Sequence, residues 1–207
     1  MHHESPPYKQ LRDRITGRVY PPGALLIPAT VGTELGVSRT PVREALHRLE
    51  YEGLVVQASR GYRVRERTAE ELLEIYDARI ALESAVAFSA ATRRSEIDLA
   101  RLSRMFDAAV ASPDPDTALG LHRNWHHALR EAAHNGTIGE LMDRLDAQMA
   151  PFEADQVRAP DNLALIEDEH REILAAVVAG EAERARTAMI AHQIRTRDLR
   201  IAAMAAR

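Results

Sequence analysis

Residues 36–55 read GVSRTPVREALHRLEYEGLV, and this stretch decides the fold of the first part of the chain. Gly36 ends one helix and Ser38 caps the next, so two helices meet within about four residues. Pro41 lies in the first turn of the second helix, where a missing N–H group has little cost. Apolar residues then recur every three or four positions, which is the spacing of one buried helical face. The residues on that face are Val42, Ala45, Leu46 and Leu49.

The sequence on both sides of this stretch completes a small domain. Residues 8–16 carry an apolar helical face, and so do residues 31–35. Residues 54–64 read LVVQASRGYRV, with β-branched residues on both sides of a turn at residues 59–61, which indicates a β-hairpin. Three short helices followed by a hairpin predict a winged helix-turn-helix domain.

The third helix of this domain leaves Arg39, Thr40 and Arg43 on its exposed N-terminal edge. In a winged helix-turn-helix, this part of the recognition helix reaches base edges in the major groove, where Arg can pair with guanine through two hydrogen bonds. A solvated, charged helix face is the alternative. The cap, the proline, the short turn and the wing all favour DNA binding because they agree with one another.

The opening stretch, together with PPGALL at residues 21–26 and SRGYRV at residues 59–64, resembles the DNA-binding signature of the GntR family of bacterial transcription regulators. The resemblance covers residue 8 to about residue 65. Pro28 and Gly32, on the second helix, depart from the family pattern, which usually has Glu and Ala at these positions. The resemblance implies that the recognition helix contacts DNA through Arg39, Thr40 and Arg43. It also implies that Arg60 and Gly61, at the wing tip, reach the minor groove or the phosphates.

From Thr68 onward there is no strand alternation, and Thr68 with Glu71 forms a capping box that opens a long helix. Short connections between the helices that follow predict an antiparallel bundle. The predicted fold class is therefore mainly α, with a winged helix-turn-helix domain over residues 1–67 and an all-α six-helix bundle over residues 68–207. The six expected helices span residues 68–93, 96–111, 116–133, 137–149, 162–179 and 181–205.

This rear part resembles the FCD domain, the all-helical effector module of the FadR branch of GntR regulators, over about residues 70–200. WHHALREAAHN at residues 125–135 is similar to the module's motif of an aromatic residue, a His and a later Asn. DEHREILAAVVAGEAERARTAMIAHQ at residues 168–193 is similar to its closing segment. Six helices in place of seven suggest the VanR-like subgroup.

The FCD resemblance implies a metal site whose ligands are His126, His170 and His192, and it aligns His122 with an Asp or Asn of the family. His122 and His126 share one helical face at i and i+4, so they can chelate one ion, while two further helices supply the other imidazoles. Ordinary core or surface histidines are the alternative. An all-nitrogen site favours zinc or nickel over manganese and magnesium. We therefore expect one divalent metal ion bound by His122, His126, His170 and His192.

Arg79 lies in YDARIALE at residues 76–83, where the family has an Arg that often faces the effector cavity. A guanidinium beside a metal ion can bind a small carboxylate through paired, charge-assisted hydrogen bonds. An ion pair with Glu83, one turn further on, is the alternative. Arg79 is therefore the expected effector-binding residue.

The charge distribution divides the chain in the same way. Residues 1–67 hold eleven Lys or Arg against seven Asp or Glu, a net charge of +4, whereas residues 68–207 hold sixteen against twenty-four, a net charge of −8. Only the first part suits a polyanion such as nucleic acid. The absence of Cys excludes disulfides, thiolate zinc sites and cysteine catalysis. With no apolar run near roughly 18 residues and no signal-peptide pattern, we expect a cytoplasmic protein that does not enter the membrane.

These patterns favour a transcription regulator, a repressor or an activator, that binds a double-stranded DNA operator as a homodimer. A small organic acid bound at the metal would modulate its affinity for the operator. One alternative is a metal-dependent enzyme with an appended DNA-binding domain. No well-supported general acid or base accompanies the histidines, so we expect no enzyme. The other alternative is a regulator whose metal is purely structural.

Overall fold

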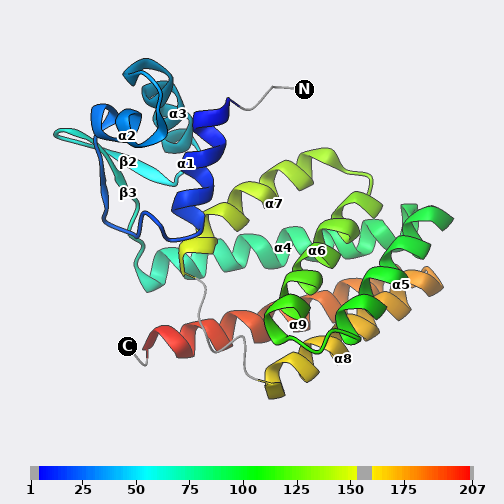
Figure 1. Cartoon of the computed structure of the whole chain (residues 1–207). Coiled ribbons are helices and arrows are strands. Elements are labelled where there is room, and N and C mark those ends of the chain that lie inside the picture. Colours follow the sequence, from blue (N-terminus) through cyan, green and yellow to red (C-terminus); the bar gives the residue numbers. More distant parts are fainter. Residues whose placement is uncertain (1–4, 153–159, 206–207) are drawn as a thin grey trace. The chain divides into compact units, whose positions relative to one another are not determined.

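The computed structural model describes residues 5–152 and 160–205, shown in Figure 1. The chain divides into two compact units, Met1–Thr68 with Asp143–Glu153 and Ala69–Met142 with Ala154–Arg207, called here the winged unit and the helical unit. The described residues form nine α-helices and one three-stranded sheet, which confirms the predicted mainly α fold class. In this part of the chain, no helix combines the length and the apolar character needed to cross a membrane.

The first segment of the winged unit, up to Thr68, contains three helices and a small antiparallel sheet (Figure 1). Its helices are α1 (Pro6–Thr16), α2 (Pro28–Leu35) and α3 (Arg39–Tyr51), and its strands are β1 (Leu25–Leu26), β2 (Val55–Ala58) and β3 (Gly61–Val64). The strand order is β1-β3-β2, so β3 lies in the centre and pairs with β2 through the wing turn. The three helices and the hairpin were expected, whereas β1 was not.

The apolar face predicted for α3 forms the centre of this unit. Its four expected residues are at most 2% exposed, and Leu11 and Ile15 of α1 pack in the same cluster. Gly36 has a left-handed conformation with φ of +67°, which an L side chain rarely adopts, so the break between α2 and α3 occurs where glycine is favoured. Ser38 is the N-cap residue of α3, although its side chain makes no cap hydrogen bond.

Pro28 and Gly32, the two residues that depart from the GntR pattern, both suit the local structure of α2. Pro28 is the first helical residue, where its fixed φ suits a helix and its missing N–H group has no helical partner to lose. A Cβ atom on Gly32 would lie 2.8 Å from the carbonyl oxygen of Val37. The missing side chain therefore lets the turn between α2 and α3 pack against α2.

The end of α7 (Gly136–Met149) and the short 3-10 helix η1 (Ala150–Phe152) pack within the winged unit. Ala147 is 5% exposed and belongs to the same apolar cluster as α3. The Gln148 side chain donates to the carbonyl oxygen of Glu52 at 2.8 Å and accepts from Arg67 at 2.6 Å. Residues 143–152 thus support the C-terminal end of α3, although they lie well beyond the domain boundary expected at residue 67.

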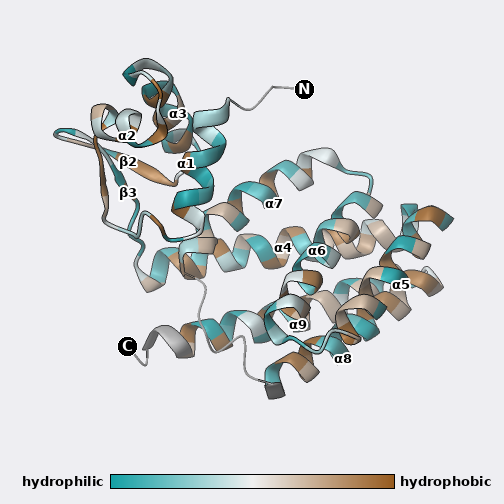
Figure 2. Ribbon diagram, viewed as in Figure 1, coloured by the Kyte–Doolittle hydropathy of each residue, from teal (hydrophilic) through white to brown (hydrophobic). Residues whose placement is uncertain are grey.

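The helical unit contains the remaining long helices. They are α4 (Ala69–Arg93), α5 (Glu96–Val110), α6 (Pro115–Ala132), α8 (Pro160–Ala179) and α9 (Ala182–Ala205), joined by the first half of α7. Apolar and hydrophilic residues are interspersed along these helices, as expected for helices that bury one face (Figure 2). Each lies within a few residues of its expected range.

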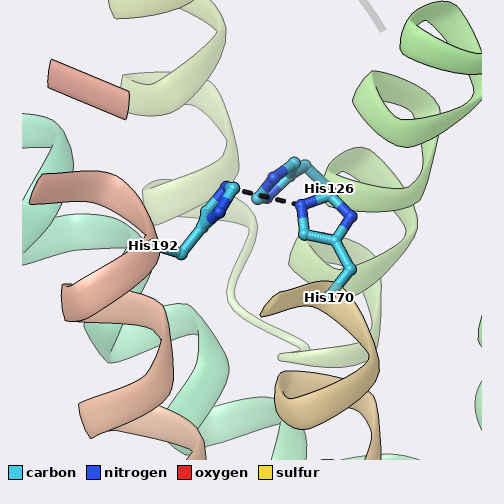
Figure 3. Close-up of side chains that lie close together, drawn as sticks. All are labelled: His126, His170 and His192. Carbon is cyan, nitrogen blue, oxygen red and sulfur yellow. Dashed lines mark hydrogen bonds between the residues drawn. The ribbon is translucent and has the colours of Figure 1, made fainter. Parts of the chain in front are cut away.

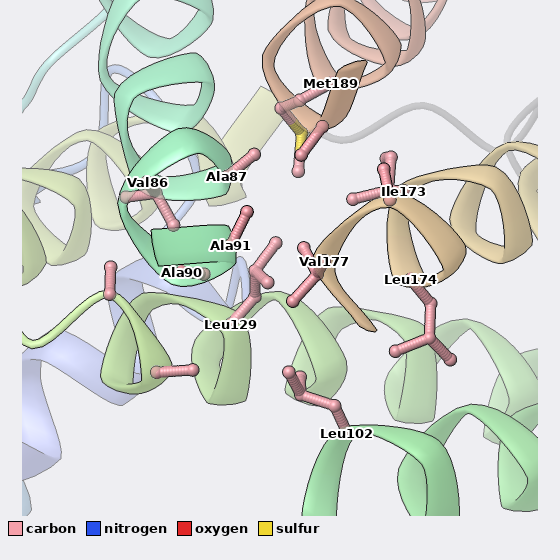
Figure 4. Packing of buried hydrophobic residues seen from close by; sticks show 14 of the residues in the cluster. Val86, Ala87, Ala90, Ala91, Leu102, Leu129, Ile173, Leu174, Val177 and Met189 are labelled. Carbon is pink, nitrogen blue, oxygen red and sulfur yellow. The ribbon is translucent and has the colours of Figure 1, made fainter. Parts of the chain in front are cut away.

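Apolar side chains from α4, α5, α6, α8 and α9 form the core of this unit (Figure 4). The contribution of α4 is mostly alanine, which occupies little volume, so larger side chains from the other helices fill the space between them. Leu129, Ile173 and Met189 are each fully buried in this cluster. The core therefore fixes α6, α8 and α9 beside one another, and these are the three helices that carry the histidines of interest.

Candidate metal centre and nucleic-acid interface

Three histidines from three different helices meet inside the helical unit. His126 comes from α6, His170 from α8 and His192 from α9, and one nitrogen of each lies within 4.8 Å of the other two (Figure 3). His170 is 1% exposed and His192 is 4% exposed. The structure therefore brings together three of the four histidines that the sequence singled out.

The closest pair in this group has a spacing that suits a shared ion. His170 Nε2 and His192 Nε2 are 3.4 Å apart, the contact dashed in Figure 3. Two nitrogens bound to a tetrahedral zinc ion, each at about 2.0–2.1 Å, are separated by roughly 3.3 Å. These two nitrogens could therefore bind one ion with little movement, and His126 lies close enough to add a third.

The surroundings of His126 and His170 keep these two imidazoles in the neutral form that binds metals. Burial lowers the pKa of both His126 and His170 well below the usual value, with a further contribution from neighbouring cationic groups. Nδ1 of His126 is buried and has no hydrogen-bond partner. A neutral imidazole has a free lone pair at one nitrogen, so the chemistry and the geometry of the donor set both fit a divalent ion.

His122 lies next to this group but outside it. It is 3% exposed, and its Nδ1 is 3.1 Å from Nδ1 of His170, whereas His192 contacts the other ring nitrogen of His170, Nε2. Burial lowers the pKa of His122 to about 4, with a further lowering from His192. The structure thus places the fourth expected ligand behind His170, in contact with it.

A carboxylate on α8 contacts the third histidine of the group. Glu169 Oε2 is 2.7 Å from His192 Nδ1 and also accepts from Arg195 Nη2 at 2.7 Å. Arg195 reaches Asn162 Oδ1 at 2.6 Å as well. Burial raises the pKa of Glu169, and the hydrogen bonds from His192 and Arg195 lower it by more, so the net shift is downward. Sequence reasoning missed Glu169 and Arg195, although Glu169 directly precedes His170.

A second carboxylate, Glu83 of α4, is completely buried beside His126. Its Oε1 accepts from Arg130 Nη2 at 2.6 Å and lies 3.8 Å from Arg79 Nη2 and 4.0 Å from His126 Nδ1. The ion pair between Arg79 and Glu83 considered from the sequence is therefore present, and Arg79 and His126 both border one carboxylate oxygen. Arg130 was not expected here, although it follows His126 by one helical turn.

The residues expected to contact DNA lie on the surface of the winged unit. Arg39, Thr40 and Arg43 are exposed at the N-terminal end of α3, and Arg60 is exposed at the turn between β2 and β3. Gly61 has φ of +133°, and a Cβ atom there would lie 2.5 Å from the carbonyl oxygen of Leu26. Gly61 is therefore required for packing against β1, which is a structural demand separate from any DNA contact.

Comparisons with known proteins agree with this architecture. The family model for the FCD domain matches residues 74–195, and the model for bacterial regulatory proteins of the gntR family matches residues 8–64. The chain is 30% identical to the protein assigned as regulator of the L-lactate dehydrogenase operon in Escherichia coli (strain K12), over 77% of this chain and 70% of that protein.

Two further proteins match most of the chain. The Uxu operon transcriptional regulator of Escherichia coli (strain K12) is 30% identical over 90% of this chain and 83% of its own length. Among solved structures, E. coli McbR/YncC matches with a TM-score of 0.72 and 24% identity, covering 92% of this chain and 94% of that one. The likeness to McbR/YncC extends to the fold.

Proposed function

The chain belongs to the gntR family of bacterial regulatory proteins and carries an FCD domain, and on this basis we propose that a small organic acid controls its affinity for an operator. The proposal combines a DNA-binding winged unit with an acid-binding metal centre in the helical unit. The observation that carries it is the group of His126, His170 and His192 beside the buried pair of Glu83 and Arg130. A regulator of this kind acts in the cytoplasm, where the chromosomal DNA is.

The first part of the proposal is a divalent ion held by His126, His170 and His192. Nitrogen donors favour zinc or nickel. Three protein ligands leave the fourth position of a tetrahedral ion open, and the ion would supply a Lewis-acid contact for a carboxylate at that position. Because only the folded chain assembles the three imidazoles, the bound ion stabilises the helical unit.

The second part is a cationic side chain that orients the acid. Arg79 and His126 both lie within 4.0 Å of Glu83 Oε1, so an acid bound at the ion would have a guanidinium nearby. A planar guanidinium can pair with a carboxylate through two hydrogen bonds. Arg79 is 15% exposed at its side chain, which leaves it accessible to a small ligand.

The third part is recognition of a two-fold operator by a homodimer. Arg39, Thr40 and Arg43 would enter the major groove, and Arg60 at the wing would contact the minor groove or the phosphates. Residues 65–68 join the wing directly to α4, the helix that carries Arg79 and Glu83. A shift of α4 on acid binding would therefore re-aim the two recognition helices of the dimer.

The test begins with metal analysis of the purified protein, followed by operator titrations in the presence of a panel of small carboxylates. We expect one divalent ion per chain, a lower melting temperature after chelation, and an acid that changes operator affinity by about 1–3 kcal/mol. Operator DNA should change the affinity for that acid by the same factor. Arg79→Ala should abolish the response and leave acid-free DNA binding nearly unchanged, while Arg93→Ala, an exposed Arg on the same helix, should retain the response.

Three outcomes would contradict the proposal. Stoichiometric analysis that finds no metal, or chelation that leaves stability unchanged, removes the metal centre. Acids that bind at the ion but leave operator affinity unchanged point to a structural metal. Turnover of one of the carboxylates points to a metal-dependent enzyme.

A further inference from the structure

His170 and His192 each have a second contact, made by the ring nitrogen that does not face the other histidine. His170 and His192 face each other through Nε2, whereas their Nδ1 atoms contact His122 at 3.1 Å and Glu169 at 2.7 Å. A neutral imidazole carries its proton on one nitrogen and a lone pair on the other. The group that contacts Nδ1 therefore decides whether Nε2 is available to bind an ion.

We propose that Glu169 and His122 are the outer partners of the metal centre, which fix His192 and His170 with Nε2 presented to the ion, and that His122 is not itself a ligand. This inference rests on the metal site proposed above. It assigns a role to Glu169, which no sequence pattern had singled out, and it separates His122 from the three ligands.

The contact at His192 has a defined direction. A carboxylate can only accept, so His192 must donate from Nδ1 and keep its lone pair on Nε2. Arg195 holds both oxygens of Glu169, and Asn162 accepts from the same guanidinium. This hydrogen-bonded chain fixes the carboxylate, and a fixed carboxylate behind a histidine raises the basicity of the nitrogen that faces the ion.

The contact at His170 can run in either direction, and only one direction suits a metal. If His122 donated, the proton of His170 would lie on Nε2 and would block binding. If His170 donates from Nδ1, His122 accepts there and carries its own proton on Nε2, a buried nitrogen that has no hydrogen-bond partner. An unpartnered buried N–H is destabilising. The contact between Nδ1 of His122 and Nδ1 of His170 gives a reason for His122 to occupy this position despite that cost.

Placement also argues against His122 as a ligand. The group of nitrogens that lie within 4.8 Å of one another contains His126, His170 and His192, and neither nitrogen of His122 belongs to it. His122 Nδ1 instead contacts Nδ1 of His170, which is not the nitrogen that faces His192. The centre then has three protein ligands, and the acid can take the open position.

The experiment compares four variants of the full chain with the wild type. Each is loaded with zinc or cobalt(II), and the ion is quantified per chain, its affinity is measured by competition with a chelating dye, and the number of imidazoles around it is measured by X-ray absorption. His122→Leu and Glu169→Gln should retain one ion with the wild-type number of imidazoles but bind it about 10–100-fold more weakly. Glu167→Gln, a half-buried carboxylate on the same helix, should match the wild type. His126→Ala should lose one imidazole from the ion.

Each result has a clear meaning. An imidazole lost in His122→Leu would make His122 a ligand and overturn its assignment. Wild-type affinity in both Glu169→Gln and His122→Leu would overturn the outer-partner roles while leaving the metal site in place. A wild-type protein that binds no ion would overturn both this inference and the proposed function.

A measurement without substitutions covers the case in which His122→Leu does not fold. Long-range ¹H–¹⁵N correlation spectra of the wild-type protein distinguish the two neutral tautomers of each imidazole. We expect protons on Nδ1 of both His170 and His192. A proton on Nε2 of either ring would contradict the proposal.

Discussion

The winged unit and the helical unit bury different kinds of side chain. In the part of the chain that the structure describes, the buried core of the winged unit is apolar, with Leu11, Leu46 and Leu49 at its centre. The buried polar or charged residues all belong to the helical unit and are Glu83, Ser84, His122, Arg130, Asn162, His170, His192 and Gln193.

This difference shows where each unit carries its chemistry. The charged residues expected to contact DNA are on the surface of the winged unit, so its core serves stability alone. The helical unit instead places carboxylates, guanidinium groups and imidazoles inside, where burial is costly unless each group has a partner. Substitution of a buried charged residue in the helical unit should therefore lower stability. Substitution of an exposed charged residue in the winged unit should instead weaken DNA recognition.

The largest effect should come from breaking the buried ion pair of the helical unit. Arg130→Leu leaves the completely buried Glu83 without its 2.6 Å partner, so we expect a loss of about 3–5 kcal/mol in the free energy of unfolding. Denaturant unfolding followed by the fluorescence of Trp125, the only Trp in the chain, would measure this loss, because Trp125 is buried in the helical unit. The double variant Arg130→Leu with Glu83→Leu should recover much of it.

The matched control for that variant is an exposed ion pair in the same unit. Arg101→Leu removes a contact to Glu131 between two side chains that are about half exposed, and we expect a change of at most about 1 kcal/mol. Equal losses in Arg130→Leu and Arg101→Leu would mean that the buried pair has no special role in stability.

Acid should sharpen the contrast between the units in the metal-free protein. Burial lowers the pKa of His122 to about 4, and it lowers the pKa of His126 and of His170 well below the usual 6.5. The unfolded chain then binds more protons than the folded chain, so stability is complete above about pH 6.5 and falls as the pH drops toward 4. Each histidine contributes up to about 1.4 kcal/mol per pH unit.

The measurement is amide hydrogen exchange of metal-free protein at pH 7 and pH 5, which gives the free energy of opening of each unit separately. The winged unit has no buried histidine among its described residues, so it should keep its stability over this range. A helical unit that is equally stable at both values would show that folding does not lower the pKa of its histidines.

Recognition in the winged unit should be lost without a loss of stability. Arg43→Ala removes an exposed side chain of α3, and we expect about 1–3 kcal/mol less discrimination at one base pair of the operator, with an unchanged free energy of unfolding. Titrations against the operator and single-base variants would measure it. Lys9→Ala, an exposed cation on α1, should keep the wild-type preference. Arg43→Ala binding with full selectivity would exclude base reading by this residue.

Local patterns predict most of the fold because they are repeated along each element. Val42 to Leu49 follow the helical period, and the six rear helices each contain several turns of the same pattern. The two residues of β1 are too few to show a strand period, and they pair with β3 across more than thirty positions. Ala147 likewise gives no local sign that the end of α7 packs against α3.

The resemblance to the FCD domain singled out His126, His170 and His192 as neighbours, and these three side chains do meet. Whether they bind a metal ion stays a prediction. Glu169 and Arg130 are charged residues of the kind usually found on solvated helix faces, so the sequence does not distinguish them. Their contacts follow from the packing of α8 on α9 and of α6 on α4. The contact of His122 with His170 likewise depends on the side-chain conformation of His122, which residue spacing does not determine.

The smallest effect should be at the wing, where Arg60 tests whether the surface of the winged unit has two kinds of DNA contact. The turn that carries Arg60 is held against β1 because Gly61 packs on the carbonyl oxygen of Leu26. Arg60→Ala should therefore weaken binding to operator and non-operator DNA by a similar factor. The slope of log affinity against log salt should decrease in magnitude by about 0.9, as expected for one lost phosphate contact. An unchanged slope, or a changed base preference, would contradict this role. Gly61→Ala cannot replace this variant, because its Cβ atom would displace β1 and change the shape of the wing while leaving its charge unchanged.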